Sequence, residues 1–171
     1  MSGITADSEN PQGGVIQKAA DDGNLWLDVN AYPAIELLNE DWNPDFAHFS
    51  DYQNGLKLGG VKLNLDGSLP GMTAFSSQSY HKPPTGQPVD YHGYPAWSEK
   101  QIEGFINKAW DNDRQILMHT NADAASYQML DAIKSLKDAT SKDWRPVMLH
   151  AQIAREDQFD DIAGVEHYPK R

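Results

Sequence analysis

The sequence predicts a single α/β domain in which parallel strands are joined by crossover helices, as in part of a (β/α) barrel. Two observations support this fold class. From residue 98 onward, helical and strand-like patterns alternate, and a strand–helix unit precedes them, an order typical of parallel sheets. The 171 residues, 39% of them hydrophobic, can form one core, but a closed TIM-type barrel of eight strands needs about 200 to 250 residues. We therefore treat residues 1–171 as one incomplete barrel domain.

The first part of the chain carries several short patterns. Residues 14–22 predict a helix that ends at Gly23, a residue suited to a helix C-terminus. The alternation from Leu25 to Tyr32, before Pro33, predicts a strand. A short helical piece is expected at 34–39, no clean period is visible over 40–57, and the apolar run Val61–Leu65 predicts the next strand.

A long loop is predicted at residues 67–98, where five prolines interrupt every period. Loops of this length in compact domains usually bind ligands or are disordered. The loop holds five aromatic residues, which favour an ordered loop lying over a pocket: Phe75, Tyr80, Tyr91, Tyr94 and Trp97. The alternative is that these side chains pack the loop onto the barrel and contact no ligand.

The second part alternates more clearly. Ser98 and Gln101 have the spacing of a capping box, and an apolar stripe at Ile102, Phe105, Ile106 and Ala109 then predicts a helix. The remaining expected elements are a strand that ends at His119, a helix at 124–137, a strand over Pro146–His150, a helix near 156–163 and a last strand that begins near Gly164.

Composition limits the classes of partner. The formal net charge of −11 argues against nucleic acid and anionic membranes, which need basic surfaces. The absence of cysteine excludes disulfides and thiolate metal sites. No apolar run approaches the ~18 residues of a membrane span, and the first residues lack a signal-peptide pattern. We expect a cytoplasmic protein with a small-molecule substrate.

Three polar residues stand at the ends of predicted strands: Lys62, His119 and His150. In a barrel the carboxyl ends of the strands converge on one face, so these side chains would share a site. Imidazoles bind metals, whereas a lysine ammonium has only donors and becomes a ligand when deprotonated or converted by CO2 into a carbamate. Taken singly, each residue is more often structural, and it is their joint placement that favours a metal site.

Three motifs carry a family resemblance: Val61-Lys-Leu-Asn-Leu-Asp-Gly-Ser68, His119-Thr-Asn-Ala-Asp-Ala-Ala125 and Arg145-Pro-Val-Met-Leu-His-Ala-Gln152. They resemble the amidohydrolase superfamily, in particular its family 3 branch, the relatives of N-substituted formamide deformylase. The resemblance implies a metal-dependent hydrolase of carbon–nitrogen bonds other than peptide bonds, which acts through metal-activated water. It also implies that Lys62, carboxylated, and both His119 and His150 bind one or two divalent ions, with zinc as the expected metal.

The sequence also departs from the family pattern. The first-strand His-x-His pair does not occur, the last-strand aspartate would lie beyond residue 171, and Ala122 stands where glycine is usual. The chain therefore resembles about strands two to six of the eight-stranded barrel. These departures keep a second hypothesis open, a non-catalytic truncated module that self-associates, or binds a ligand without turnover, and that holds no metal. Open strand edges predict a homo-oligomer.

Four residues near the candidate ligands could support the site. Asp66, Asn121 and Asp123 directly follow the ligand positions and could orient the ligands. Turn formation and helix capping are at least equally good explanations for the two aspartates. Arg155 could bind a substrate carboxylate, although a solvated arginine at a helix start is the simpler reading. The other histidines, at positions 48, 81, 92 and 167, are expected to be solvated or structural.

Overall fold

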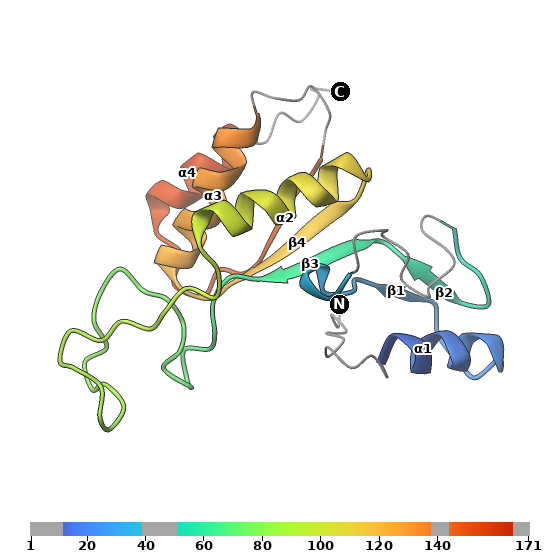
Figure 1. Cartoon of the computed structure of the whole chain (residues 1–171), viewed down its shortest axis with the longest axis horizontal. Helices are drawn as coiled ribbons and strands as arrows, with labels where there is room; N and C mark the ends of the chain where they lie inside the picture. Colours follow the sequence, from blue (N-terminus) through green and yellow to red (C-terminus); the bar gives the residue numbers. More distant parts are fainter. Residues whose placement is uncertain (1–11, 39–50, 138–143, 166–171) are drawn as a thin grey trace.

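The computed structural model describes residues 12–38, 51–137 and 144–165. Helices and strands alternate along most of this length (Figure 1). The elements are α1 (Gln12–Asp21), β1 (Val29–Ala31), the 3-10 helix η1 (Ile35–Leu37), β2 (Leu56–Leu58), β3 (Gly60–Asn64), α2 (Glu99–Asp111), β4 (Gln115–Thr120), α3 (Asp123–Lys137), β5 (Val147–His150) and α4 (Glu156–Val165).

All strand pairs between these elements are parallel. β3, β4 and β5 form one open sheet in that order, and β1 and β2 form a second, two-stranded sheet. Helices α2, α3 and α4 lie on one side of β3 and β4 (Figure 1). The prediction of an α/β fold with parallel strands and crossover helices is confirmed.

The main core lies between the three-stranded sheet and its helices. Val61 and Leu63 of β3 and Met118 of β4 are fully buried there against Ile106 of α2 and Ile133 of α3. Because side chains alternate along a strand, the residues between them face the opposite side of the sheet. Lys62 and His119 are therefore on the face that the helices do not cover.

β2 and β3 follow each other so closely that they act as one bent strand. Val29 pairs with Leu56, but Ala34 pairs with Lys62, so this strand has one more residue than its neighbour over the same stretch. That extra residue is a bulge near Gly59. A side chain at Gly60 would collide with the backbone carbonyl of Gln115, so glycine is needed where β3 meets β4.

Two helix ends follow their sequence signals. The backbone N–H of Ser98 donates to Gln101 Oε1 over 3.0 Å, as the capping box predicts. Gly23 has a φ of +70° after α1, and its N–H donates to the carbonyl of Ala20. None of the helices in the part of the chain that the structure describes could span a bilayer.

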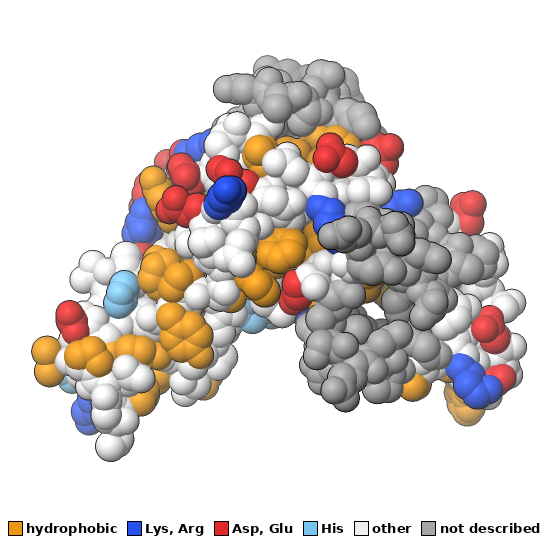
Figure 2. Space-filling view, in the orientation of Figure 1, with side chains coloured by type: hydrophobic (Ala, Val, Ile, Leu, Met, Phe, Trp, Pro, Cys, Tyr) orange, Lys and Arg blue, Asp and Glu red, His pale blue; other side chains and the backbone are white. Residues whose placement is uncertain are grey.

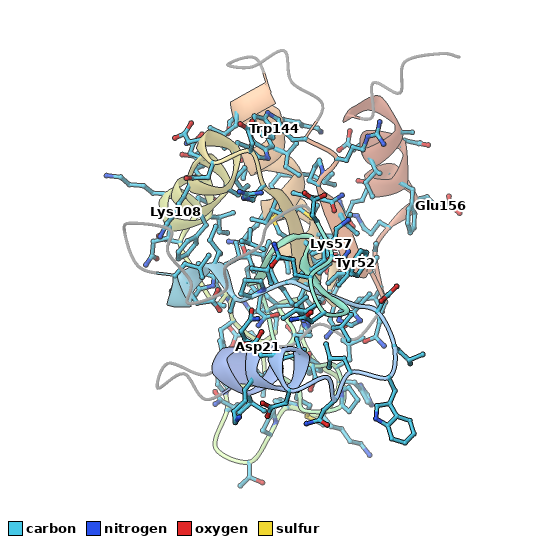
Figure 3. The ribbon with its side chains drawn as sticks, turned by 90° about the vertical axis from the view of Figure 1, so that its right-hand side faces the viewer. Asp21, Tyr52, Lys57, Lys108, Trp144 and Glu156 are labelled. Carbon is cyan, nitrogen blue, oxygen red and sulfur yellow. The ribbon has the colours of Figure 1, made fainter. Side chains whose placement is uncertain are left out.

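The structure differs from the sequence analysis in three places. The strand expected over Leu25–Tyr32 is present only at Val29–Ala31, because Trp26 and Leu27 are 94% and 79% exposed and pair with no neighbour strand. β2 was not predicted, and Figure 3 shows its Lys57 beside Tyr52, with the ammonium 5.4 Å from the ring centroid. Gly164 lies in the last turn of helix α4 and does not begin a strand. The end of the helical piece expected at 34–39 and the continuation of the strand expected from Gly164 fall at residues 39–50 and 166–171, which lie outside the described residues.

The loop at 67–98 contains no helix or strand and projects from the carboxyl end of β3 (Figure 1). Its aromatic residues mainly contact the protein itself. Tyr80 stacks on Tyr91 with ring centroids 5.9 Å apart, and the indole N–H of Trp97 donates to the carbonyl of Asn64. Hydrophobic side chains are also visible on its surface (Figure 2), and Val89 is 89% exposed. Packing thus accounts for Tyr80, Tyr91 and Trp97, whereas Tyr94 is 54% exposed, and a role in covering a pocket stays a prediction.

Candidate metal centre

Lys62 and His119 lie on the same face of adjacent strands. In the β3–β4 register Asn64 is opposite His119, and Lys62 is opposite Leu117, one side-chain repeat earlier. Neighbouring strands are about 4.8 Å apart and a two-residue repeat spans about 6.6 Å, so the backbones of Lys62 and His119 are about 8 Å apart. A lysine side chain can cross this distance.

His150 reaches the same place through an unusual backbone conformation. It pairs with Thr120 in the register, which would direct a regular strand residue to the helix-covered face. Instead, His150 and Ala151 have φ values of +71° and +47°, in the left-handed region that few non-glycine residues adopt. The imidazoles of His119 and His150 then meet edge to face, with centroids 4.6 Å apart. Strain of this kind is typical of functional sites.

The surroundings of His150 favour its neutral form. Partial removal from water lowers the pKa of His150 below its usual 6.5, and the nearby His119 and Lys62 side chains lower that pKa further. A neutral imidazole has a free electron pair, which a metal ligand requires. Lys62 is thus within electrostatic range of His150.

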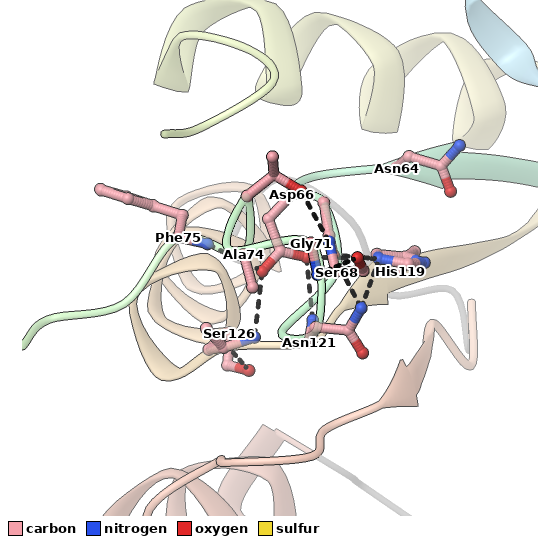
Figure 4. A network of polar contacts seen from close by, with 12 residues as sticks. Asn64, Asp66, Ser68, Gly71, Ala74, Phe75, His119, Asn121 and Ser126 are labelled. Atoms are coloured by element: carbon pink, nitrogen blue, oxygen red, sulfur yellow. Dashed lines mark hydrogen bonds and ion pairs between the residues drawn. The ribbon is translucent and has the colours of Figure 1, made fainter. Parts of the chain in front are cut away.

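Asp66 organises the backbone around His119. Its side chain is fully buried, and its carboxylate accepts hydrogen bonds from the N–H groups of Asn121 at 2.9 Å, Ala122 at 3.0 Å and Phe75 at 3.1 Å. These donors belong to the segment after β4 and to the long loop after β3 (Figure 4). Asp66 therefore ties both segments to the end of β3, as expected for a residue that forms a turn.

The next residue, Gly67, holds the ring of His119. The carbonyl oxygen of Gly67 is 3.0 Å from Nε2 of His119 and accepts a 2.7 Å hydrogen bond from the side-chain amide of Asn121. That amide is itself 3.0 Å from Nε2 (Figure 4). With the proton on Nε2, His119 donates to Gly67 and keeps a free electron pair on Nδ1. In this tautomer the Gly67 carbonyl fixes the orientation of the imidazole, and Asn121 holds that carbonyl in place.

Asp123 and Arg155 form a separate network. Nη1 of Arg155 donates to Asp123 over 3.0 Å, while its Nε and Nη2 donate to Asp157. Burial alone would raise the pKa of Asp123, but hydrogen bonds from Ser77 and Arg155 outweigh it and lower that pKa. Among the described residues, Asp123 and Arg155 make no hydrogen bond or ion pair with Lys62, His119 or His150. The structure therefore brings these two residues to each other and not to the candidate ligands.

Within residues 12–38, 51–137 and 144–165, no three His, Cys, Asp or Glu side chains gather as a metal site. The candidate site has two such residues, so its third ligand depends on Lys62. The sequence analysis did not identify Gly67, which acts through its backbone carbonyl on His119. It also did not identify Ser77, which donates to Asp123. His92 is structural, as expected, because its Nδ1 lies 2.6 Å from the carbonyl of Ser76.

Comparisons with known proteins match a family model and two solved structures. A family model described as the amidohydrolase family, family 3, matches residues 2–166. An uncharacterized metal-dependent hydrolase from Pyrococcus furiosus is 25% identical with a TM-score of 0.75, and the alignment covers 95% of this chain and 32% of that one. A second such hydrolase, from Pyrococcus horikoshii OT3, is 23% identical with a TM-score of 0.71 and coverages of 89% and 29%. No curated protein is significantly similar. The chain spans about a third of the length of these solved relatives.

Proposed function

Because the chain belongs to the amidohydrolase family, we propose that it contributes the centre of a metal-dependent hydrolase that acts on carbon–nitrogen bonds other than peptide bonds in small molecules. Lys62, His119 and His150 are its proposed metal ligands. The solved relatives are described as metal-dependent hydrolases. Because this chain spans about a third of their length, the activity of the whole enzyme is part of the proposal.

The contact between the two imidazoles carries this proposal. His119 and His150 meet with ring centroids 4.6 Å apart, and Nε2 of His119 is engaged by the carbonyl of Gly67. Metal-binding histidines commonly donate their second ring N–H to such a carbonyl, which fixes the tautomer. This arrangement supports Nδ1 of His119 as the atom that binds the metal. Imidazole and oxygen ligands suit zinc among the divalent ions.

A bound divalent ion of this kind would acidify water and polarise a carbonyl or amidine group. The chain itself supplies the electron pairs of His119 and His150 and holds the His119 ring in place through the Gly67 carbonyl, which Asn121 also contacts. An unmodified Lys62 ammonium would repel a cation, since it has three donors and no acceptor. We therefore propose that Lys62 is carboxylated when one or two ions are bound.

A second candidate function is a non-catalytic module that binds a ligand without turnover. It is favoured by one observation, that no group of three His, Cys, Asp or Glu side chains forms a metal site in the described ranges. Zinc analysis of the purified protein distinguishes the two. Near-stoichiometric zinc supports the hydrolase site, whereas a zinc-free protein that takes up none on dialysis supports the module.

Carboxylation of Lys62 gives a specific prediction. In ¹³C-labelled bicarbonate with zinc, the wild-type protein should show a carbamate carbon signal by NMR, and Lys62→Met should lack it. The variant should also bind zinc at least ten-fold more weakly, because it loses an anionic ligand. Lys57→Met, which changes a lysine of β2 beside Tyr52, is the matched control and should keep both properties. A carbamate signal that persists in Lys62→Met would contradict the assignment.

We also propose that the protein self-associates. β5 is an edge of the three-stranded sheet in the described part of the chain, and an open strand edge tends to pair with another chain. Sedimentation velocity at micromolar concentration should show a dimer or larger species. A single monomeric species across this range would contradict the proposal.

A further inference from the structure

A second carboxylate, Asp123, joins the segments that follow all three strands of the main sheet. Asp123 is the first residue of α3, directly after β4, and only 7% of its side chain is exposed. It accepts a 2.8 Å hydrogen bond from the backbone N–H of Ser77, which lies in the loop after β3, and another from the hydroxyl of Ser77. It also accepts the 3.0 Å hydrogen bond from Arg155, which lies after β5.

The neighbouring backbone strengthens the same junction. The side-chain amide of Gln158, which is 1% exposed, donates to the carbonyl of Asp123 over 2.7 Å, and its oxygen accepts from the N–H of Arg155. The N–H of Ala125 donates to the carbonyl of Phe75. Helix α3, the start of α4 and the base of the loop are thus fixed to one another.

This junction differs from the one that Asp66 makes. Asp66 and Gly67 orient His119 directly, whereas Asp123 contacts the loop about ten residues further along the chain. The loop of residues 67–98 carries both anchors near its start and begins at the Gly67 carbonyl that holds His119. It is the segment of the described chain that projects beyond the carboxyl ends of β3 and β4 (Figure 1), where ligands of (β/α) barrels bind.

We propose that Asp123, Arg155 and Ser77 form a latch that holds the loop of residues 67–98 at the carboxyl end of the sheet, where it contacts the organic part of a ligand bound at His119 and His150. Asp123 and Arg155 are positioning residues, and they bind neither the metal nor the reacting group. The inference rests on the proposed function, because the loop can select a ligand only if that ligand binds beside the two histidines.

Two independent measurements test the latch. Hydrogen–deuterium exchange of loop peptides reports whether the loop is held. The affinity of cobalt-loaded protein for benzohydroxamate, a metal-binding probe with an aromatic group, reports whether the loop contacts a ligand. The affinity for Co²⁺ alone is the internal reference, since Asp66 and Gly67 hold His119 without the latch. The variants are Asp123→Asn and Ser77→Ala, which loses only the hydroxyl contact. Asp157→Asn is the matched control, because Asp157 binds Arg155 but not the loop.

In Asp123→Asn, exchange in the loop should accelerate at least ten-fold and benzohydroxamate should bind at least five-fold more weakly, with Co²⁺ affinity within two-fold of the wild type. Ser77→Ala should change the loop exchange rate and the benzohydroxamate affinity in the same direction by smaller factors. This variant tests the latch if Asp123→Asn fails to fold. Asp157→Asn should resemble the wild type. Unchanged exchange in both variants, or unchanged benzohydroxamate affinity despite faster exchange, would overturn the latch. A wild-type protein that binds no Co²⁺ would instead refute the proposed function and with it the ligand contact, while the exchange data would still decide whether the loop is held.

Discussion

Replacement of both His119 and His150 with alanine is expected to abolish zinc binding at micromolar metal. Structural zinc sites with four ligands bind with about 10 to 16 kcal/mol, or roughly 3 kcal/mol per ligand, so each single replacement should weaken binding by about 100-fold. The imidazole rings lie 4.6 Å apart at the centroid, close enough for both to reach one ion. Competition titration with a chromophoric chelator measures the affinity.

The control for this experiment is His81→Ala. His81 is an exposed residue of the long loop, and its loss should leave zinc affinity unchanged. If the double variant binds zinc as tightly as the wild type, His119 and His150 are structural residues. In that case the non-catalytic module becomes the better explanation of the chain.

Replacement of Asp66 with alanine should lower the free energy of unfolding by about 3 kcal/mol or more. The carboxylate satisfies three backbone N–H groups, two of them in fully buried contacts. A buried donor without a partner costs about 1 to 3 kcal/mol. Urea denaturation followed by circular dichroism measures the effect. Zinc affinity should fall as well, since the segment after β4 carries Asn121 and follows His119 directly.

Asp131→Ala is the matched control, because Asp131 is exposed on α3 and alanine is a better helix former than aspartate. It should change the stability by less than about 0.5 kcal/mol, in line with exposed positions generally. A similar small change in Asp66→Ala would show that water replaces the lost acceptor, and that Asp66 does not organise the end of β3.

The α/β class and the second half of the chain could be predicted because their signals are local. The capping box and the apolar stripe of α2 and the short apolar runs of β4 and β5 each lie within one element. The strand at β1 was predicted too long, since alternation from Leu25 gives no information on whether a partner strand extends that far. β2 has only three residues, and its place depends on β1, which pairs with it from a distance of 27 residues.

The proximity of His119 and His150 could also be predicted, because both stand at or near strand ends that meet at one edge of a parallel sheet, whereas Lys62 lies in the middle of β3. Their supporting contacts could not. The bond from Ser77 to Asp123 joins residues 46 apart, and serine is common in loops of every kind. The left-handed backbone at His150, which brings its ring to His119, has no sequence signal, since glycine or asparagine is the usual residue in that conformation.

The central claim is that Lys62, His119 and His150 share one metal site. Anomalous diffraction at the zinc edge from crystals grown with zinc and bicarbonate tests it most directly. We predict a peak within bonding distance, about 2.0 to 2.1 Å, of a nitrogen from each imidazole, with a carbamate oxygen of Lys62 as a further ligand. A peak elsewhere on the molecule, with none between His119 and His150, would contradict the claim.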